Sequence, residues 1–367
     1  MDKILRVDSL IMYYFIFAVL FFFSAIEMSS YKKSVLWFNI VYVLMTLMVM
    51  FRYGQLTDYF NYEILYENPD SMGEWRDPLY FVLVRICIWL GLGYKGLVFI
   101  VGAITMGFAY PFFSKCCDRS AAALFVFYCY VFLILPMSAM RQGICLALLL
   151  WSYSLLIEGK KLWFYIIMLI GSLIHFSMLA VVLIGLFYRK DWYNRGFIKW
   201  VVLGLTVFAL VTPDLTQYIP DVLGDRSLGE YEDSRLVQMT IRGFLIMPVL
   251  FIKPEEGSHG YYAKAICIIG YCLYCCFAFS SMIAGRLEFL FRVFYCLFVA
   301  HVLFNMGKIY LDHFLLGCIL MIHVVLFFKN MNAAIEQGDY FEDKVTMFNF
   351  PYISIFEEEE LENYKFK

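Results

Sequence analysis

Apolar residues dominate the pattern along this chain, in long runs separated by short polar stretches. A helix that spans a bilayer needs about 20 mainly apolar residues. The runs that approach this length are residues 10–27, 35–51, 96–113, 121–136, 139–157, 161–175, 177–188, 197–212, 236–252, 261–280, 287–306 and 310–328. The pattern therefore predicts an all-α polytopic integral membrane protein with about 12 transmembrane helices.

Two segments fit this length criterion poorly. Residues 161–188 form one apolar run that is too long for one helix and short for two, and His175 lies in its middle. A broken or re-entrant pair of helices is therefore an alternative there. Segment 79–92 is short and contains Arg85, which favours an interfacial helix. The number of spans is predicted only to within about two.

Composition supports the membrane class and excludes several others. The 367 residues are 62% hydrophobic and 16% charged, with a mean hydropathy of +0.72, which is more apolar side chain than a soluble domain can bury. A net charge of −2 provides no basic field, so no nucleic acid partner is expected. Most of the 11 cysteines lie inside apolar runs and predict neither disulfides nor a metal site. The first span lacks a small-residue cleavage site and is interpreted as a retained helix.

Basic residues indicate the orientation. If the amino terminus lies outside, most lysine-bearing connections fall inside, in agreement with the positive-inside rule. Most arginines then lie outside or in the outer half of a span, against the same rule, and we interpret them as ligands of an anion. The two large outer loops are residues 52–78 and 213–235. Beyond a membrane domain of residues 1–329, the polar and acidic segment 330–367 is interpreted as a flexible tail.

The motif FRYGQLTDYFNYE places acids and aromatic rings directly after the second apolar run. If residues 56–66 are helical, Asp58 and Tyr62 share one face, and Glu63 lies beside Tyr59. A carboxylate flanked by tyrosines suits a sugar hydroxyl and can act as a general base. The alternative is an aromatic belt with incidental acids, because tyrosine favours membrane interfaces.

Three further clusters carry polar groups inside or beside apolar runs. In LPMSAMRQGICLALLLW, Arg141 and Gln142 open a span, and the planar fork of an arginine suits phosphate oxygens. The alternative for Arg141 is snorkelling to the headgroups. His175, in GSLIHFSM, is a candidate catalyst, but a lone histidine in an apolar helix is more often a buried core residue. In SSMIAGRLEFLFR, Arg286 is a second candidate anion ligand, whereas Glu288 and Arg292 can pair with each other at i,i+4.

The order of the motifs resembles a known family. The motifs RYGQLTDYFNYE, DPLY, MSAMRQGICLAL, IHFSM, GRLEFLF and PYISIF together resemble the EpsG family of exopolysaccharide polymerases, which is similar to the Wzy-type polymerases. The chain departs from the family pattern at Leu56, where a glycine is usual, and at Asp77, where a glutamate is frequent.

The resemblance implies polymerisation of polyprenyl-pyrophosphate-linked repeat units, at the outer face of the cytoplasmic (inner) membrane of a bacterium. Donor, acceptor and membrane lipids would be its partners, together with a flippase and a chain-length regulator of the same pathway. A GT-C-like membrane glycosyltransferase architecture is compatible with this resemblance. No carboxylate pair stands at metal-ligand spacing, so the reaction is expected to need no metal or other cofactor.

The resulting hypothesis assigns roles to individual residues. Arg141 and Arg286 would hold the pyrophosphate, with Arg52 assisting, and Asp58 would be the base or the anchor of the acceptor hydroxyl. His175 and Glu63 are rivals for the role of Asp58. Further substrate-binding residues would be Tyr59, Tyr62, Asp77 and Gln142. Three alternative functions stay open: a flippase or transporter of the same lipid-linked substrate, a membrane acyltransferase centred on His175, and a glycosyltransferase that adds single sugars.

Overall fold

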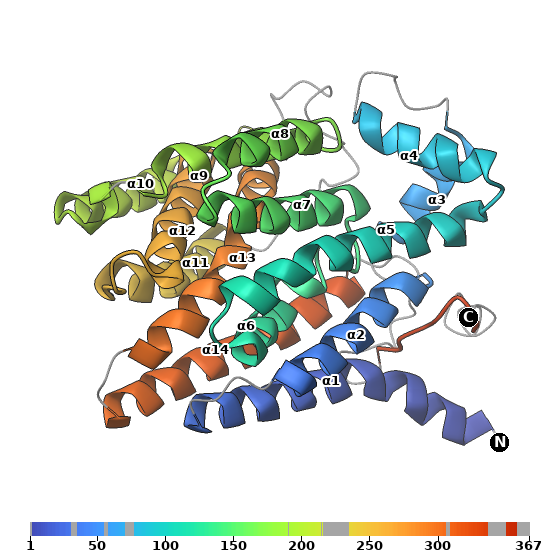
Figure 1. Ribbon diagram of the computed structural model, residues 1–367, viewed down its shortest axis with the longest axis horizontal. Helices are drawn as coiled ribbons and strands as arrows, with labels where there is room; N and C mark the ends of the chain where they lie inside the picture. The colour runs from blue at the N-terminus through green and yellow to red at the C-terminus, as the bar shows by residue number, and fades with distance from the viewer. Residues whose placement is uncertain are drawn as a thin grey trace. The chain divides into compact units, whose positions relative to one another are not determined.

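The computed structural model describes residues 2–30, 35–54, 58–69, 77–189, 191–213, 215, 235–305, 309–336 and 350–357. Within these residues the chain is all-α, with 14 α-helices and four short 3₁₀ or π segments (Figure 1). It divides into two compact units. Unit 1 comprises Met1–Phe176 and Met306–Lys367, and unit 2 comprises Ser177–Asn305. The predicted all-α class is therefore confirmed.

Unit 1 contains nine of the described helices, most of them apolar. They are α1 (Asp2–Ser30), α2 (Val35–Phe51), α3 (Tyr59–Glu67), α4 (Pro78–Trp89), α5 (Gly93–Pro111), α6 (Ser120–Phe127), α7 (Met140–Ile157), α8 (Lys161–Ser172) and α14 (Ile309–Glu336). Helix α5 is central, because α2, α4 and α7 all pack against it. A glycine at 102 permits the approach of α2, since a Cβ there would lie 2.9 Å from the Cα of Met50.

A buried carboxylate joins α1 to α6. The Glu27 side chain has no exposed surface, and its Oε2 accepts hydrogen bonds from the backbone N–H groups of Ala121 (2.8 Å) and Ala122 (3.1 Å). These two groups belong to the first turn of α6, where backbone donors lack helical partners and the helix dipole favours negative charge. Glu27 therefore acts as a helix cap supplied by another helix.

The described end of the chain, residues 350–357, packs against the end of α2, and we call it the C-terminal strap. The N–H of Tyr53 donates to the carbonyl of Ile353, and the N–H of Ile355 donates to the carbonyl of Phe51, both at 2.9 Å. Figure 1 shows this red, extended segment beside the last turn of α2. Phe350 and Ile353 are fully buried. These residues are therefore not a flexible tail, although the division at residue 329 stays a prediction.

Unit 2 is built on a pair of long helices. Its elements are α9 (Val182–Phe187), α10 (Phe197–Val211), α11 (Arg235–Phe251), α12 (His259–Cys276) and α13 (Ser281–Asn305). Helices α12 and α13 form the main contact, and α10 and α11 pack against α12. Helix α10 exposes large apolar side chains, including Trp200 and Val211, which are more than 70% exposed. Such a surface is consistent with a membrane location.

The helices agree in place with most predicted spans. The run 35–51 is α2, and the run 139–157 is α7. The run 161–188 is broken as suggested, because α8 ends at Ser172 and a 3₁₀ segment, Phe176–Val181, follows. By length and composition, two described helices can cross a membrane. They are Gly93–Cys116, which is α5 with the π segment Phe112–Cys116 that continues it, and Met140–Ile157, which is α7. Most other apolar helices are shorter. The count of about 12 spans and the orientation stay predictions.

Candidate functional site

Arg141 forms a largely buried ion pair with Asp77. Arg141 lies in the first turn of α7, and Asp77 directly precedes α4. The Nη1 of Arg141 lies 2.5 Å from the Oδ2 of Asp77, and the two side chains are 16% and 6% exposed. Burial strengthens their attraction but also removes both charges from water. The pair therefore fixes the position of one end of the guanidinium.

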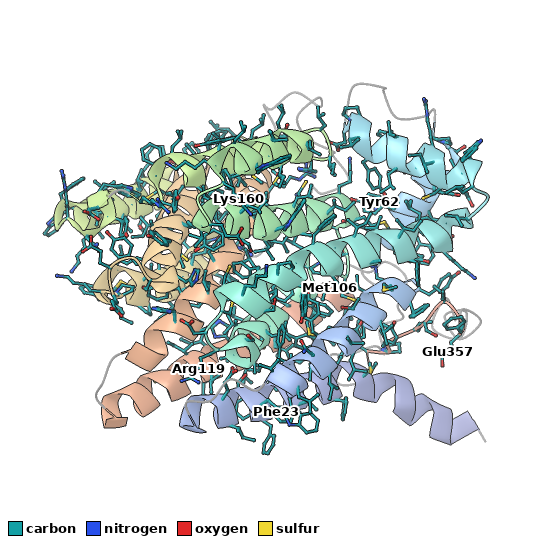
Figure 2. All side chains as sticks on the ribbon, viewed as in Figure 1. Phe23, Tyr62, Met106, Arg119, Lys160 and Glu357 are labelled. Atoms are coloured by element: carbon teal, nitrogen blue, oxygen red, sulfur yellow. The ribbon has the colours of Figure 1, made fainter. Side chains whose placement is uncertain are left out.

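Two tyrosines complete the surroundings of this guanidinium. The Nε of Arg141 donates to the Oη of Tyr62 (3.3 Å), and its Cζ lies 5.5 Å from the ring centroid of Tyr62 and 6.0 Å from that of Tyr80. Both distances allow cation–π attraction. Figure 2 labels Tyr62, which lies near the start of α7. The Nη2 of Arg141 has no hydrogen-bond partner among the described residues, so this end of the fork can take a ligand.

The backbone of Asp77 is strained. Its φ of 56° and ψ of 51° are left-handed, and no other described non-glycine residue has a positive φ. The residue before a proline normally prefers extended conformations, and here Pro78 follows. Aspartate tolerates the left-handed region better than glutamate does, because its short side chain can hydrogen-bond locally. Strain of this kind is frequent at ligand-binding sites.

Asp58 lies near Tyr62, whose backbone N–H donates to the Asp58 carbonyl (3.0 Å). Asp58 precedes α3. Burial raises the pKa of Tyr62, the charge of Arg141 lowers this pKa, and the charge of Asp58 raises it further. The negative charge of Glu63 interacts instead with the hydroxyl group of Tyr94, at the start of α5. The expected helix is present at Tyr59–Glu67, directly after Asp58.

Arg52 lies in a separate environment, formed mainly by tyrosines. Its side chain is 1% exposed, and its Nη1 donates to the carbonyl of Val49 (2.5 Å). Its Nη2 is buried and has no hydrogen-bond partner among the described residues. Burial lowers the pKa of Arg52, and four nearby tyrosines oppose this effect: Tyr59, Tyr80, Tyr94 and Tyr352. Tyr80 is shared, because the charges of both Arg52 and Arg141 act on its hydroxyl.

His175 and Gln142 lie on elements that adjoin the pair. His175 is buried in the break after α8, and its ring stacks on Phe176 with centroids 5.1 Å apart. The break lies beside α4, because the N–H of Leu79 donates to the carbonyl of Leu173 (3.0 Å). Gln142 follows Arg141 in α7 and is half-buried. Neither position tests the role predicted for these residues.

Unit 2 contains a second cluster of charged side chains. The Oε2 of Glu288 lies 2.5 Å from the Nη2 of Arg292 and 3.2 Å from the Nε of Arg242. The expected pairing of Glu288 with Arg292 is therefore confirmed, and Arg242 of α11 joins it. Arg286 is half-buried near the start of α13. Its predicted role as an anion ligand stays a prediction.

No group of three or more His, Cys, Asp or Glu side chains that could hold a metal ion occurs in the described part of the chain. Guanidinium, carboxylate and tyrosine hydroxyl groups are gathered where Arg141 of α7 contacts Tyr62 of α3 and Asp77 at the start of α4. Sequence reasoning missed Tyr80 and Tyr94, although Tyr80 belongs to the DPLY motif.

Comparison with known families identifies the family of this chain. The sequence model described as the EpsG family matches residues 35–354, a range that contains every residue of the site and most of the C-terminal strap. The chain belongs to the EpsG family. No curated protein and no solved structure matches it. The EpsG family is associated with exopolysaccharide biosynthesis, so the Arg141–Asp77 pair and its tyrosines belong to a protein of that process.

Proposed function

We propose that this EpsG family protein is a membrane glycosyltransferase that polymerises polyprenyl-pyrophosphate-linked oligosaccharide repeat units at the outer face of the cytoplasmic membrane. The observation that supports this most directly is the meeting of three separate motifs at Arg141. Asp77 comes from DPLY, Tyr62 from RYGQLTDYFNYE, and Arg141 itself from MSAMRQGICLAL. A site assembled in this way has the groups that a diphosphate leaving group and a sugar acceptor require.

The reaction forms one glycosidic bond and breaks one bond to phosphate. A hydroxyl of the acceptor sugar attacks the anomeric carbon of the donor chain, and the bond between that carbon and the pyrophosphate oxygen breaks. Polyprenyl pyrophosphate leaves with the electron pair, and the hydroxyl proton passes to a base. Negative charge gathers on the leaving group while the sugar becomes oxocarbenium-like. The hardest requirement is therefore a fixed positive charge beside the diphosphate.

Arg141 meets this requirement. Asp77 and Tyr62 hold its Nη1 and Nε, which leaves Nη2 for a phosphate oxygen. A guanidinium held in this way needs little reorganisation when the charge develops. Asp77 is a positioning residue in this account, because it acts on the substrate through Arg141. Arg286 remains a further pyrophosphate ligand predicted from the sequence.

Asp58 is the proposed base. Among the three rivals it is the one whose charge acts on Tyr62, the tyrosine that contacts Arg141. Glu63 acts on Tyr94, and His175 stacks on Phe176. Tyr59, Tyr62 and Gln142 would then contact the sugar. The reaction is proposed to need no metal, and a flippase and a chain-length regulator of the same pathway are its expected partners.

A reconstituted assay tests this function. Purified protein in liposomes is supplied with lipid-linked repeat unit and no nucleotide sugar, and the products are separated by size. A ladder of products supports the polymerase. A single added group indicates an acyltransferase or a glycosyltransferase that adds single sugars, and it contradicts polymerisation.

One observation favours a second function, transport of the lipid-linked oligosaccharide. The cluster of Arg242, Glu288 and Arg292 is buried between apolar helices α11 and α13, and charged groups inside apolar helices are typical of transport pathways. In the same liposomes, movement of the substrate across the bilayer without a new glycosidic bond would favour transport over polymerisation.

A further inference from the structure

The C-terminal strap closes over a buried arginine. Its Ser354 forms an antiparallel backbone bridge with Arg52, the residue that follows α2, and the Oη of Tyr352 donates to the carbonyl of Met48 (3.0 Å). Arg52 itself is only 1% exposed. The strap therefore forms part of the wall between this arginine and the outside of unit 1.

Arg52 has no counter-ion in the part of the chain that the structure describes. No described carboxylate forms a salt bridge with it, and its buried Nη2 makes no hydrogen bond there. A guanidinium removed from water is costly unless it is paired and hydrogen-bonded. The groups around it are the side chains of Tyr59, Tyr94 and Tyr352, together with Tyr80. The hydroxyls of Tyr80, Tyr94 and Tyr352 already donate to the Sδ of Met140, the carbonyl of Tyr59 and the carbonyl of Met48. An anion would therefore be bound first by the Nη2 of Arg52, and the Tyr352 hydroxyl could donate to it once its bond to Met48 opens.

We propose that Arg52 and these tyrosines form a second anion site, separate from the Arg141–Asp77 pair, that binds a phosphoryl group and is closed by the C-terminal strap. The strap lifts to admit the anion, and it returns when Arg52 is paired. Among the described residues, the polar contacts that resist this movement are two backbone hydrogen bonds to Phe51 and Tyr53 and the bond of the Tyr352 hydroxyl to Met48. Ring contacts such as that of Tyr13 with Phe350 (5.6 Å) add to them.

The phosphoryl group can come from two sources, a diphosphate or a phospholipid headgroup. A diphosphate would be that of a lipid-linked substrate, and in this one respect the inference rests on the proposed function. Arginine suits both sources, because its planar fork donates hydrogen bonds to two phosphate oxygens at once. The test therefore uses a phosphate-free detergent, to which inorganic pyrophosphate or phosphatidylglycerol is added separately.

Phenylglyoxal modifies accessible guanidinium groups, and peptide mass spectrometry measures the rate at which it modifies Arg52. In the full chain we expect slow modification of Arg52. A chain that ends at Asn349 lacks the strap and should react about tenfold faster or more. A chain that ends at Glu357 keeps the strap and is the matched control, expected to react as slowly as the full chain. Tyr352→Phe removes only the hydroxyl that binds Met48, and it should raise the rate several-fold even if the shortened chain fails to fold.

Added anion should reverse this reactivity. Saturating pyrophosphate is expected to slow modification of Arg52 about tenfold in the chain that ends at Asn349 and in Tyr352→Phe, as charge-assisted hydrogen bonds to a phosphate would. Protection by phosphatidylglycerol alone would assign the site to a lipid headgroup. Protection by neither anion, or equal reactivity of Arg52 in the full chain and in both opened variants, would overturn the inference. This readout is independent of polymer formation, so its failure and that of the proposed function are distinguishable.

Discussion

Arg141 and Asp77 form an ion pair in the interior of unit 1, although 64 positions of sequence separate them. Asp77 adopts a left-handed backbone conformation at the position from which its carboxylate contacts the arginine. The pair explains why an arginine can open an apolar helix such as α7 at a tolerable cost. Because each side chain holds the other in place, a substitution of either residue should change the position of the other.

Asp77→Asn tests this dependence. Asparagine tolerates the left-handed conformation, so the local fold should persist while the negative charge is lost. We expect polymer formation to fall about tenfold or more, because a hydrogen bond to a charged group contributes about 1.5–3 kcal/mol. Polymer is measured by the liposome ladder, with the amount of protein in the membrane checked in parallel. Asp118→Asn makes the same change at an exposed acid and should leave the ladder intact. Equal effects of the two changes would contradict the role of Asp77.

Tyr62→Phe separates the ring of this tyrosine from its hydroxyl. The ring keeps its cation–π contact with Arg141, whereas the acceptor for Nε disappears. Losing one such hydrogen bond should slow polymerisation about fivefold, since a typical bond contributes roughly 1 kcal/mol. Tyr66→Phe, in the same helix, is the control and should have little effect. A rate for Tyr62→Phe equal to that of the wild type would show that the hydroxyl is not used.

Glu27→Ala removes the cap that α1 supplies to α6. Two backbone N–H groups, those of Ala121 and Ala122, then lose their acceptor inside the protein. We expect the free energy of unfolding to fall by about 2 kcal/mol, measured by denaturation in detergent. Glu158 pairs with Lys160 at an exposed position, and Glu158→Ala should have no measurable effect on stability. Similar stability of the two variants would contradict the capping role.

Glu288→Ala should destabilise unit 2 more strongly. It leaves the guanidinium groups of Arg242 and Arg292 buried without their shared carboxylate. Breaking a buried ion pair in this way costs about 3–5 kcal/mol, whereas replacing the whole cluster by apolar residues can be nearly neutral. The variant Arg242→Met, Glu288→Leu, Arg292→Met should therefore be more stable than Glu288→Ala in thermal unfolding. The opposite order would show that the charges stabilise unit 2 by themselves.

Much of the helical fold could be predicted from the sequence, because the apolar runs are long and clearly bounded. The run 35–51 ends where Arg52 interrupts it, and α2 ends at Phe51. The break near His175 could also be anticipated from the length of the run 161–188. The packing of the strap could not, since its acidic surroundings indicated a flexible tail. Within it, Phe350 and Ile353 carry the apolar surface that buries the segment.

The site could be predicted in its parts but not in its pairing. The chemistry of Arg141, Tyr62 and Asp58 was readable from residue type and position beside apolar runs. The choice of Asp77 as the partner of Arg141 depends on how α4 and α7 pack, and no local pattern contains that information. Arg52 was expected to assist Arg141, and this stays a prediction; the structure places tyrosines around Arg52, of which Tyr80 is also near Arg141.

The most direct test of the account is the liposome ladder with Arg141→Lys, read together with the release of polyprenyl pyrophosphate. Lysine keeps the positive charge but loses the planar fork that holds Asp77, Tyr62 and a phosphate oxygen at the same time. The account predicts protein in the membrane at the normal level, no ladder and no released pyrophosphate. A full-length ladder with pyrophosphate released at the wild-type rate would contradict it.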